Sequence, residues 1–181
     1  KLLQKYRPEI KREQAWQLAT ALDNLPLALV LAGSYLASYS ESSISGYLAH
    51  LNSTGLEQGV WSAFTASYER LRLEQRTEDS SAIALLARAA CFAPGEPIPK
   101  ELLLTSLPPD TMESAILAGL KKLVELGLFQ QLSNQTYRLH RLLAHLVATA
   151  LSEQMGKARL SVEEAVVAWA DRLNQTGDPR L

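Results

Sequence analysis

The 181-residue chain has one cysteine, three histidines and nine scattered glycines, and these small numbers exclude several classes of protein. Cys91 alone cannot form an internal disulfide, which fits a protein of a reducing compartment, and we expect a cytoplasmic location. Cys91 and the histidines also lack the spacing of a zinc site. The glycines form no G-x-x-x-x-G-K-[ST] loop, and we find no catalytic constellation. We therefore expect that this chain is not itself an enzyme.

The chain also lacks an excess of charge and a long hydrophobic run. It has 18 Lys and Arg against 19 Asp and Glu, so nothing general attracts it to nucleic acid or to an anionic membrane. The uncharged segment 24–40 contains Asn, Pro, Gly and Ser, and it is shorter than the roughly 20 apolar residues that a membrane-spanning helix needs. We expect no membrane association.

What the chain does have is enough apolar residues, 47%, for a substantial core in one domain or two small ones. It opens KLLQKYRPEIKRE, without an initiator methionine or a signal-peptide pattern, and it ends TGDPRL. We therefore expect it to be part of a longer protein.

The apolar spacing in the first third of the chain predicts helices. One helix is expected over 11–23, where an i, i+3, i+4, i+7 pattern is formed by Ala15, Leu18, Ala19 and Leu22. Asn24 should end this helix. Pro26 should begin the next one, because the first helical position needs no amide hydrogen. That second helix is apolar on all sides through Gly33, so we expect it to be buried all round.

A short helix at 44–51 and a loop at 52–59 complete a helical subdomain, which we predict over 1–58. The next helix has one face formed by Trp61, Phe64, Tyr68 and Leu71. Further helices are expected around 83–90, at 100–107 and at about 111–126, with a proline-rich loop at 93–99.

Two helix-end signals flank the predicted helix at 111–126. Asp110 and Glu113 have the spacing of a capping box at its start. Gly127 suits a left-handed C-cap at its end. Beyond Gly127, residues 128–132 and 136–140 read as two short strands around a turn.

Helices followed by a β-hairpin give the order of a winged helix, and we predict this domain over 59–153, closed by a helix at about 141–153. Ser161 and Glu164 have the spacing of a second capping box, which would open a last helix to about 174. The predicted fold is therefore mainly α: a helical subdomain, a winged-helix domain with a small β-hairpin, and a C-terminal helix over 154–181.

Several segments, in this order, resemble those of one protein family. NLPLALVLAGSYLA (24–37) resembles the GLPLAL segment of the NB-ARC (STAND-class) signalling ATPases, which include plant disease-resistance proteins, apoptosome ATPases and many bacterial regulators. The family segments that come next in the chain are similar to GVWSAFTASYERL, LLARAACFAPGEPIPKELL and LKKLVELGLFQ. The end of the family's winged helix resembles TYRLHRLLAHLVATAL (136–151). Asn24 replaces the usual first glycine, and Arg141 stands where plant members usually have Asp.

The resemblance implies a regulatory role in a nucleotide-switched ATPase. An upstream P-loop NTPase domain would bind ATP or ADP with Mg, and this chain would close over the nucleotide as a lid. By the resemblance, Pro26 would contact the adenine and His140 the β-phosphate of ADP. No nucleotide is expected to bind tightly to this chain alone. The expected partners are the P-loop domain, a C-terminal sensor or repeat domain that could begin at 154–181, and further copies of the protein in an activated homo-oligomer.

Two alternatives stay open. A winged helix can bind DNA, but the presumed recognition helix carries Lys121 and Lys122 against Glu113 and Glu125, which is little positive charge for phosphate contacts. We read these two lysines as a solvated face. The chain could also be a plain protein-interaction module of a transcription regulator. Residues expected in a core or an interface are Trp16, Trp61 and Trp169.

Overall fold

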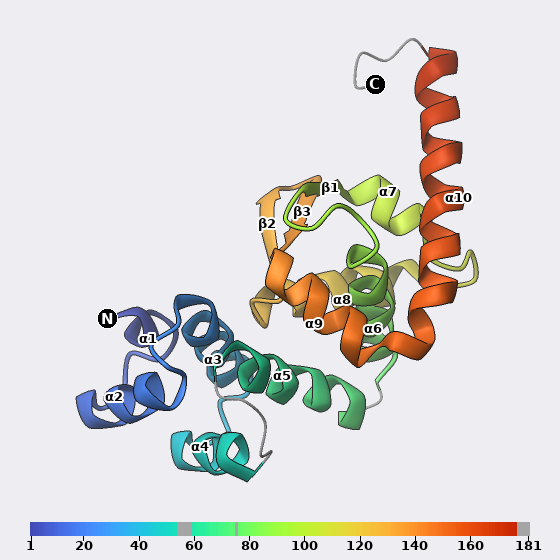
Figure 1. The fold of residues 1–181 in the computed structure, drawn as a ribbon. Coiled ribbons are helices and arrows are strands. Elements are labelled where there is room, and N and C mark those ends of the chain that lie inside the picture. The colour runs from blue at the N-terminus through green and yellow to red at the C-terminus, as the bar shows by residue number, and fades with distance from the viewer. Residues whose placement is uncertain (54–58, 75, 177–181) are drawn as a thin grey trace. The chain divides into compact units, whose positions relative to one another are not determined.

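The computed structural model describes residues 1–53, 59–74 and 76–176, which form a mainly helical protein with a small antiparallel sheet (Figure 1). This confirms the predicted fold class. Contacts divide the chain into two units: unit 1 comprises Lys1–Gln75 with Leu123–Leu128, and unit 2 comprises Arg76–Lys122 with Phe129–Leu181. Among the described helices, none is both long enough and apolar enough to span a bilayer.

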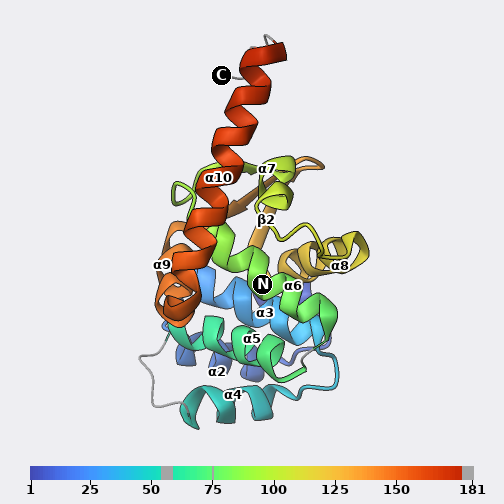
Figure 2. The same ribbon diagram turned by 90° about the vertical axis from the view of Figure 1, so that its right-hand side faces the viewer.

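Unit 1 is a set of helices arranged around one central helix. In chain order they are α1 (Leu2–Tyr6), α2 (Arg12–Ala21), α3 (Pro26–Ser38), α4 (Ile44–Ser53) and α5 (Val60–Glu74). The central helix α3 packs on α1 and α5, while α4 packs on α2 and α5 (Figure 2). Helix α1 was not predicted, because five residues are too few to show a helical period.

The junction between α2 and α3, where Asn24 was predicted to end the first helix, has left-handed backbone. Asp23 and Asn24 have φ angles of 53° and 55°. The amide of Asn24 donates to the carbonyl oxygen of Ala19 at 2.8 Å, which satisfies a carbonyl at the end of α2. Pro26 is then the first residue of α3, as predicted, and its missing amide hydrogen leaves no unsatisfied donor.

Helix α3 is not buried on all sides, so that prediction is wrong. Leu31, Ala32 and Leu36 are fully buried, whereas Pro26 is exposed and Leu29 and Val30 are half-buried. The helix is apolar over its whole circumference, but its neighbours cover only part of it. An apolar strip therefore remains accessible on its first two turns.

Unit 2 has the element order of a winged helix, followed by two more helices. The elements are α6 (Thr77–Ala89), β1 (Pro97–Pro99), α7 (Lys100–Thr105), α8 (Glu113–Glu125), β2 (Phe129–Ser133), β3 (Thr136–Leu139), α9 (Arg141–Ala150) and α10 (Ser152–Thr176). The last residues of α8 are grouped with unit 1 by their contacts. Helix–strand–helix–helix–strand–strand is the winged-helix order, and β2 with β3 is the predicted hairpin.

The sheet has the order β1-β3-β2, with antiparallel neighbours. Ile98 lies opposite Tyr137, and Phe129 lies opposite Leu139. The segment that contains β1 was predicted to be only a proline-rich loop, and the structure corrects this. Proline cannot donate to a sheet, but β1 is at an edge, where Pro97 and Pro99 need not donate to a second neighbour.

Of the three helix-end signals predicted in the second half of the chain, one is confirmed and two are wrong. Gly127 has a φ of 69°, and the amide of Leu128 donates to the carbonyl oxygen of Leu123, which confirms the predicted left-handed C-cap. Helix α8 begins only at Glu113, so Asp110 is not its N-cap. Ser161 lies inside α10, where its hydroxyl donates to the carbonyl oxygen of Lys157, so it opens no helix.

Helix α10 is thus one continuous helix from Ser152 rather than the shorter one predicted. It buries Ala158, Val162 and Ala165 and packs on α6, α7 and α9. Its C-terminal end extends past the sheet and α7 (Figures 1 and 2). The predicted domain boundary after residue 58 lies outside the described residues, and the three predicted domains stay predictions.

The backbone of α8 comes close to α6 at Gly119, and this generates a prediction. A Cβ atom at Gly119 would lie 2.9 Å from the amide nitrogen of Ala82 and 3.1 Å from the carbonyl oxygen of Glu78. Gly119→Ala should therefore destabilise the protein by about 1–3 kcal/mol, because backbone atoms cannot move aside cheaply. Chemical denaturation measures this change.

The matched control is Gly156→Ala on α10, where a Cβ atom would meet nothing within 4 Å. This substitution should stabilise the protein by roughly 0.5–1 kcal/mol, because alanine favours a helix over glycine. Equal effects of the two substitutions would contradict close packing at Gly119.

Candidate functional site

His140 lies between strand β3 and helix α9 and is the N-cap of that helix. Its Nδ1 atom accepts a hydrogen bond of 3.2 Å from the amide of Leu142. A neutral imidazole whose Nδ1 is an acceptor carries its proton on Nε2. Since His140 is exposed, its Nε2–H group can donate to a group outside the unit.

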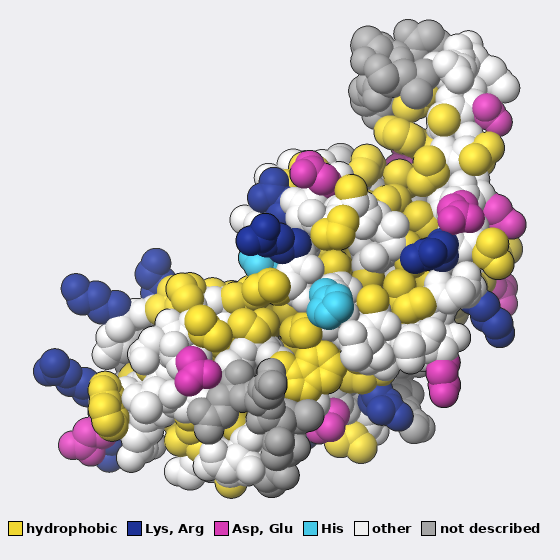
Figure 3. All heavy atoms as spheres, in the orientation of Figure 1, with side chains coloured by type: hydrophobic (Ala, Val, Ile, Leu, Met, Phe, Trp, Pro, Cys, Tyr) yellow, Lys and Arg dark blue, Asp and Glu magenta, His cyan; other side chains and the backbone are white. Residues whose placement is uncertain are grey.

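Basic side chains flank His140 in the sequence and in space. Arg138 precedes it by two positions and lies on β3, which ends just before His140. Arg138 is half-buried, and its buried Nε atom has no hydrogen-bond partner among the described residues. Arg141 is exposed at the first position of α9. Figure 3 shows Lys or Arg side chains next to a His side chain over the hairpin of unit 2. This surface suits an anionic ligand.

Pro26 belongs to unit 1, whereas His140 belongs to unit 2, so each is described by itself. The Pro26 ring is exposed at the start of α3, next to Leu25, which is also exposed. Leu29 and Val30 follow at spacings of three and four residues and thus share the face of Pro26. Together these four residues form an apolar surface that has no side-chain donor or acceptor.

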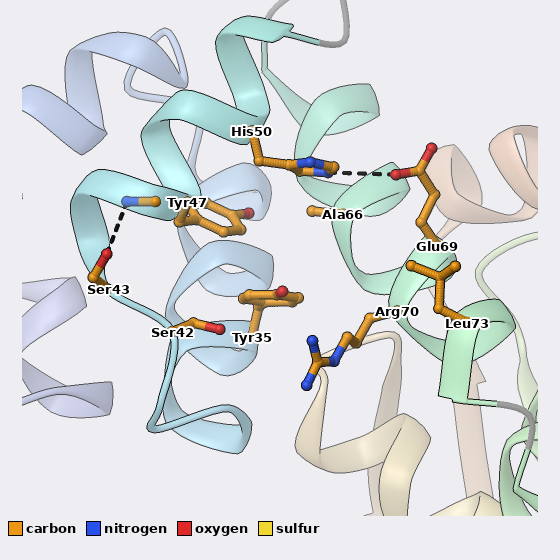
Figure 4. A pocket seen from close by; sticks show the side chains of 10 residues that line it. Tyr35, Ser42, Ser43, Tyr47, His50, Ala66, Glu69, Arg70 and Leu73 are labelled. Carbon is orange, nitrogen blue, oxygen red and sulfur yellow. Dashed lines mark hydrogen bonds and ion pairs between the residues drawn. The ribbon is translucent and has the colours of Figure 1, made fainter.

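Unit 1 also has a cavity of about 270 Å³, which the sequence analysis missed. It is lined by residues of α3, α4 and α5 and of the segment before α4 (Figure 4): Tyr35, Ser42, Ser43, Gly46, Tyr47, His50, Ala66, Glu69, Arg70 and Leu73. These residues form no known motif, and the only signal in the sequence is a concentration of tyrosines, Tyr35, Tyr39 and Tyr47.

Helix α8, the presumed DNA-recognition helix, has fewer available cations than its sequence suggests. Lys122 was read as part of a solvated face, but its side chain is only 16% exposed, so this reading is wrong. Its ammonium group forms an ion pair with Asp79 of α6, whose side chain is fully buried. Lys121 is exposed. The ion pair takes one of the two lysines away from any phosphate contact.

The three tryptophans differ in their environments. Trp16 on α2 is 70% exposed, so it is not a core residue. Trp61 is half-buried beside Phe64, with ring centroids 6.0 Å apart. Trp169 is half-buried and lines a second cavity, of about 460 Å³, together with residues of β1, α7 and β3.

Comparisons with known proteins add no assignment: no family model matches the chain, and no curated protein matches it. Among the described residues, no three His, Cys, Asp or Glu side chains gather in a way that could hold a metal ion. The roles of Pro26 and His140 therefore stay predictions.

The Asp79–Lys122 pair generates a stability prediction. Lys122→Met should lower the free energy of unfolding by about 3–5 kcal/mol, because it leaves the buried Asp79 carboxylate without its ammonium partner. The adjacent exposed position is the control, and Lys121→Met should change stability by less than about 1 kcal/mol. Urea denaturation at neutral pH distinguishes the two. Similar small effects at both positions would mean that the ion pair is not buried as described.

Proposed function

We propose that this chain is the regulatory part of a nucleotide-switched signalling ATPase of the NB-ARC type. In this proposal the chain is a lid over ATP or ADP that an upstream P-loop domain binds with Mg in the cytoplasm. The observation that carries the proposal is the exposed imidazole of His140, whose proton position is set by its bond to a backbone amide. The order of the similar segments between residues 9 and 151 supports it.

His140 has the chemistry of a phosphate sensor. With Nδ1 accepting from the amide of Leu142, the Nε2–H group is the donor that can bind a ligand. A phosphate oxygen of ADP is a strong acceptor for such a donor. Arg138 and Arg141 add positive charge next to it, which favours an anion further.

Pro26 has the chemistry of a contact to a nucleobase. Its ring is apolar, exposed and fixed at the start of α3, and it has no amide hydrogen that would need a partner. Leu25, Leu29 and Val30 extend the apolar surface around it. An adenine base covering this surface would remove apolar area from water, which is favourable by about 25 cal/mol per Å².

The switch follows from these two contacts. A lid closes over a nucleotide only if its contacts are better in the closed state, and the bound nucleotide then shifts the population toward that state. His140 contributes to closure through the β-phosphate, so it stabilises the ADP state. Exchange of the nucleotide would release the lid and expose the surface through which copies of the protein associate. Helix α10 is the part of the chain that would continue into a sensor or repeat domain.

The first functional prediction concerns release of ADP from the parent protein with its P-loop domain. His140→Ala should accelerate ADP release about tenfold or more, because a hydrogen bond to a charged group is lost. His145→Ala is the matched control, since His145 is also exposed and lies on α9, the helix that His140 caps. Stopped-flow release of a fluorescent ADP analogue measures both rates. Unchanged release from the His140 variant would make this residue only a helix cap.

The second functional prediction separates the base from the phosphates. Pro26→Ala should weaken ADP binding about fivefold and leave the binding of pyrophosphate unchanged, because only the contact with the base is reduced. His140→Ala should weaken the binding of both ligands. Isothermal titration of the parent protein gives the four affinities. If Pro26→Ala weakened pyrophosphate as much as ADP, the residue would act on the fold rather than on adenine.

A further inference from the structure

The cavity of unit 1 is a candidate binding site that the proposed nucleotide-lid function does not use. Its volume of about 270 Å³ is close to the lower limit of the roughly 300–1,000 Å³ typical of small-molecule sites. Tyr35 comes from α3, Tyr47 and His50 come from α4, and Glu69 and Arg70 come from α5 (Figure 4). Three helices of the same unit thus converge on one space.

Tyr47 provides a buried polar group without a partner in this cavity. Its side chain is 3% exposed, and its ring centroid is 4.9 Å from that of Tyr35. Its hydroxyl forms no hydrogen bond among the described residues. Buried hydroxyls are almost always hydrogen-bonded, because an unpaired one loses its interaction with water and gains nothing. Burial raises the pKa of Tyr47, and the nearby Tyr35 adds to this effect, so the hydroxyl is neutral.

The charges around the cavity disfavour an anion. The guanidinium group of Arg70 donates hydrogen bonds to the carboxylates of Glu74 at 2.6 Å and Glu41 at 3.0 Å. It also lies 4.7 Å from the ring centroid of Tyr39. Arg70 is therefore already neutralised by two carboxylates. A further anion, such as a nucleotide phosphate, would meet more negative than positive charge here.

Glu69 supplies the charge that selects the ligand. Glu69 lines the cavity, and its carboxylate is directed toward α4, where it lies 3.4 Å from Nε2 of His50 (Figure 4). Since Glu41 and Glu74 already offset the charge of Arg70, the Glu69 carboxylate adds negative charge to the cavity lining. The faces of tyrosine rings also attract cations. Carboxylate, phenol oxygen and aromatic rings form a set that suits a small cation.

We propose that this cavity binds a small organic cation with an alkylammonium group. The ammonium group would donate to the Tyr47 hydroxyl oxygen and to the Glu69 carboxylate. Its alkyl chain would lie against Tyr35 and the apolar side chains of Ala66 and Leu73, which also line the cavity. This ligand gives the Tyr47 hydroxyl the partner that it lacks among the described residues.

The test uses three probes of similar size and different charge on the whole chain: butylamine, 1-butanol and butyrate. At neutral pH butylamine is protonated, since alkylamines have pKa values near that of lysine, about 10.4. Chemical-shift titration should show millimolar binding of butylamine at α4 and α5, at least about tenfold weaker binding of butanol and no binding of butyrate. Tighter binding of butyrate, equal binding of all three probes or binding of none would each overturn the proposal.

Two variants assign the ligand contacts. Tyr47→Phe removes only the hydroxyl, and Glu69→Gln removes only the charge, so each should weaken butylamine binding about fivefold or more. Glu13→Gln is the control, because it makes the same charge change at an exposed position of α2 that does not line the cavity. Unchanged binding by both cavity variants would place the amine elsewhere and overturn the proposal.

A second measurement does not need the ligand. If the Tyr47 hydroxyl lacks a partner in the free protein, Tyr47→Phe should raise the melting temperature, because an unpaired buried polar group is removed. Excess butylamine should then stabilise the wild-type protein more than the variant. A lower melting temperature of the free variant would show that the hydroxyl already has a partner, which would contradict the proposal.

Discussion

The amide groups in the first turn of an α-helix have no carbonyl partner within the helix, and both candidate nucleotide contacts lie at such a helix start. Pro26 meets this constraint by having no amide hydrogen, and His140 meets it by accepting one with Nδ1. In each case the local requirement of the backbone fixes how the side chain is presented. The proline ring is held at the exposed start of α3, and the neutral imidazole keeps its proton on Nε2. Helix initiation and ligand contact would thus use the same residues.

Much of the fold could be predicted because its signals are local. Pro26 and Gly127 have roles that depend on a few neighbouring backbone atoms, and both were found in the structure as expected. The failures have a different origin. Ser161 and Glu164 have capping-box spacing, but the buried positions Ala158, Val162 and Ala165 continue one helical face through them. Packing against other helices therefore outweighed the local signal.

The site was predicted less completely than the fold, because tertiary contacts decide which polar groups are available. The pair Lys121 and Lys122 looks uniform in the sequence, yet Lys122 is paired with the buried Asp79. No short-range pattern could have revealed this, since the two partners are 43 residues apart. The Tyr47 hydroxyl is a similar case: the sequence shows an ordinary core tyrosine, but in the part of the chain that the structure describes its hydroxyl has no hydrogen-bond partner. Whether Pro26 and His140 contact a nucleotide stays a prediction.

The segment Leu123–Leu128 has a consequence for how unit 1 could be inherited or exchanged. Its leucines at 123, 126 and 128 are buried, and the segment groups with the helices of Lys1–Gln75 although unit 2 flanks it on both sides in the chain. Two contacts join this segment to α3. The carbonyl oxygen of Glu125 accepts a hydrogen bond from the Ser38 hydroxyl, and Gly127 lies close to Ser34 and Val30. A recombination event that joined the first 75 residues to another protein would leave this part of the core behind. Unit 1 therefore cannot be transferred as the first 75 residues alone, and a gene fusion that preserves it must include the chain through residue 128.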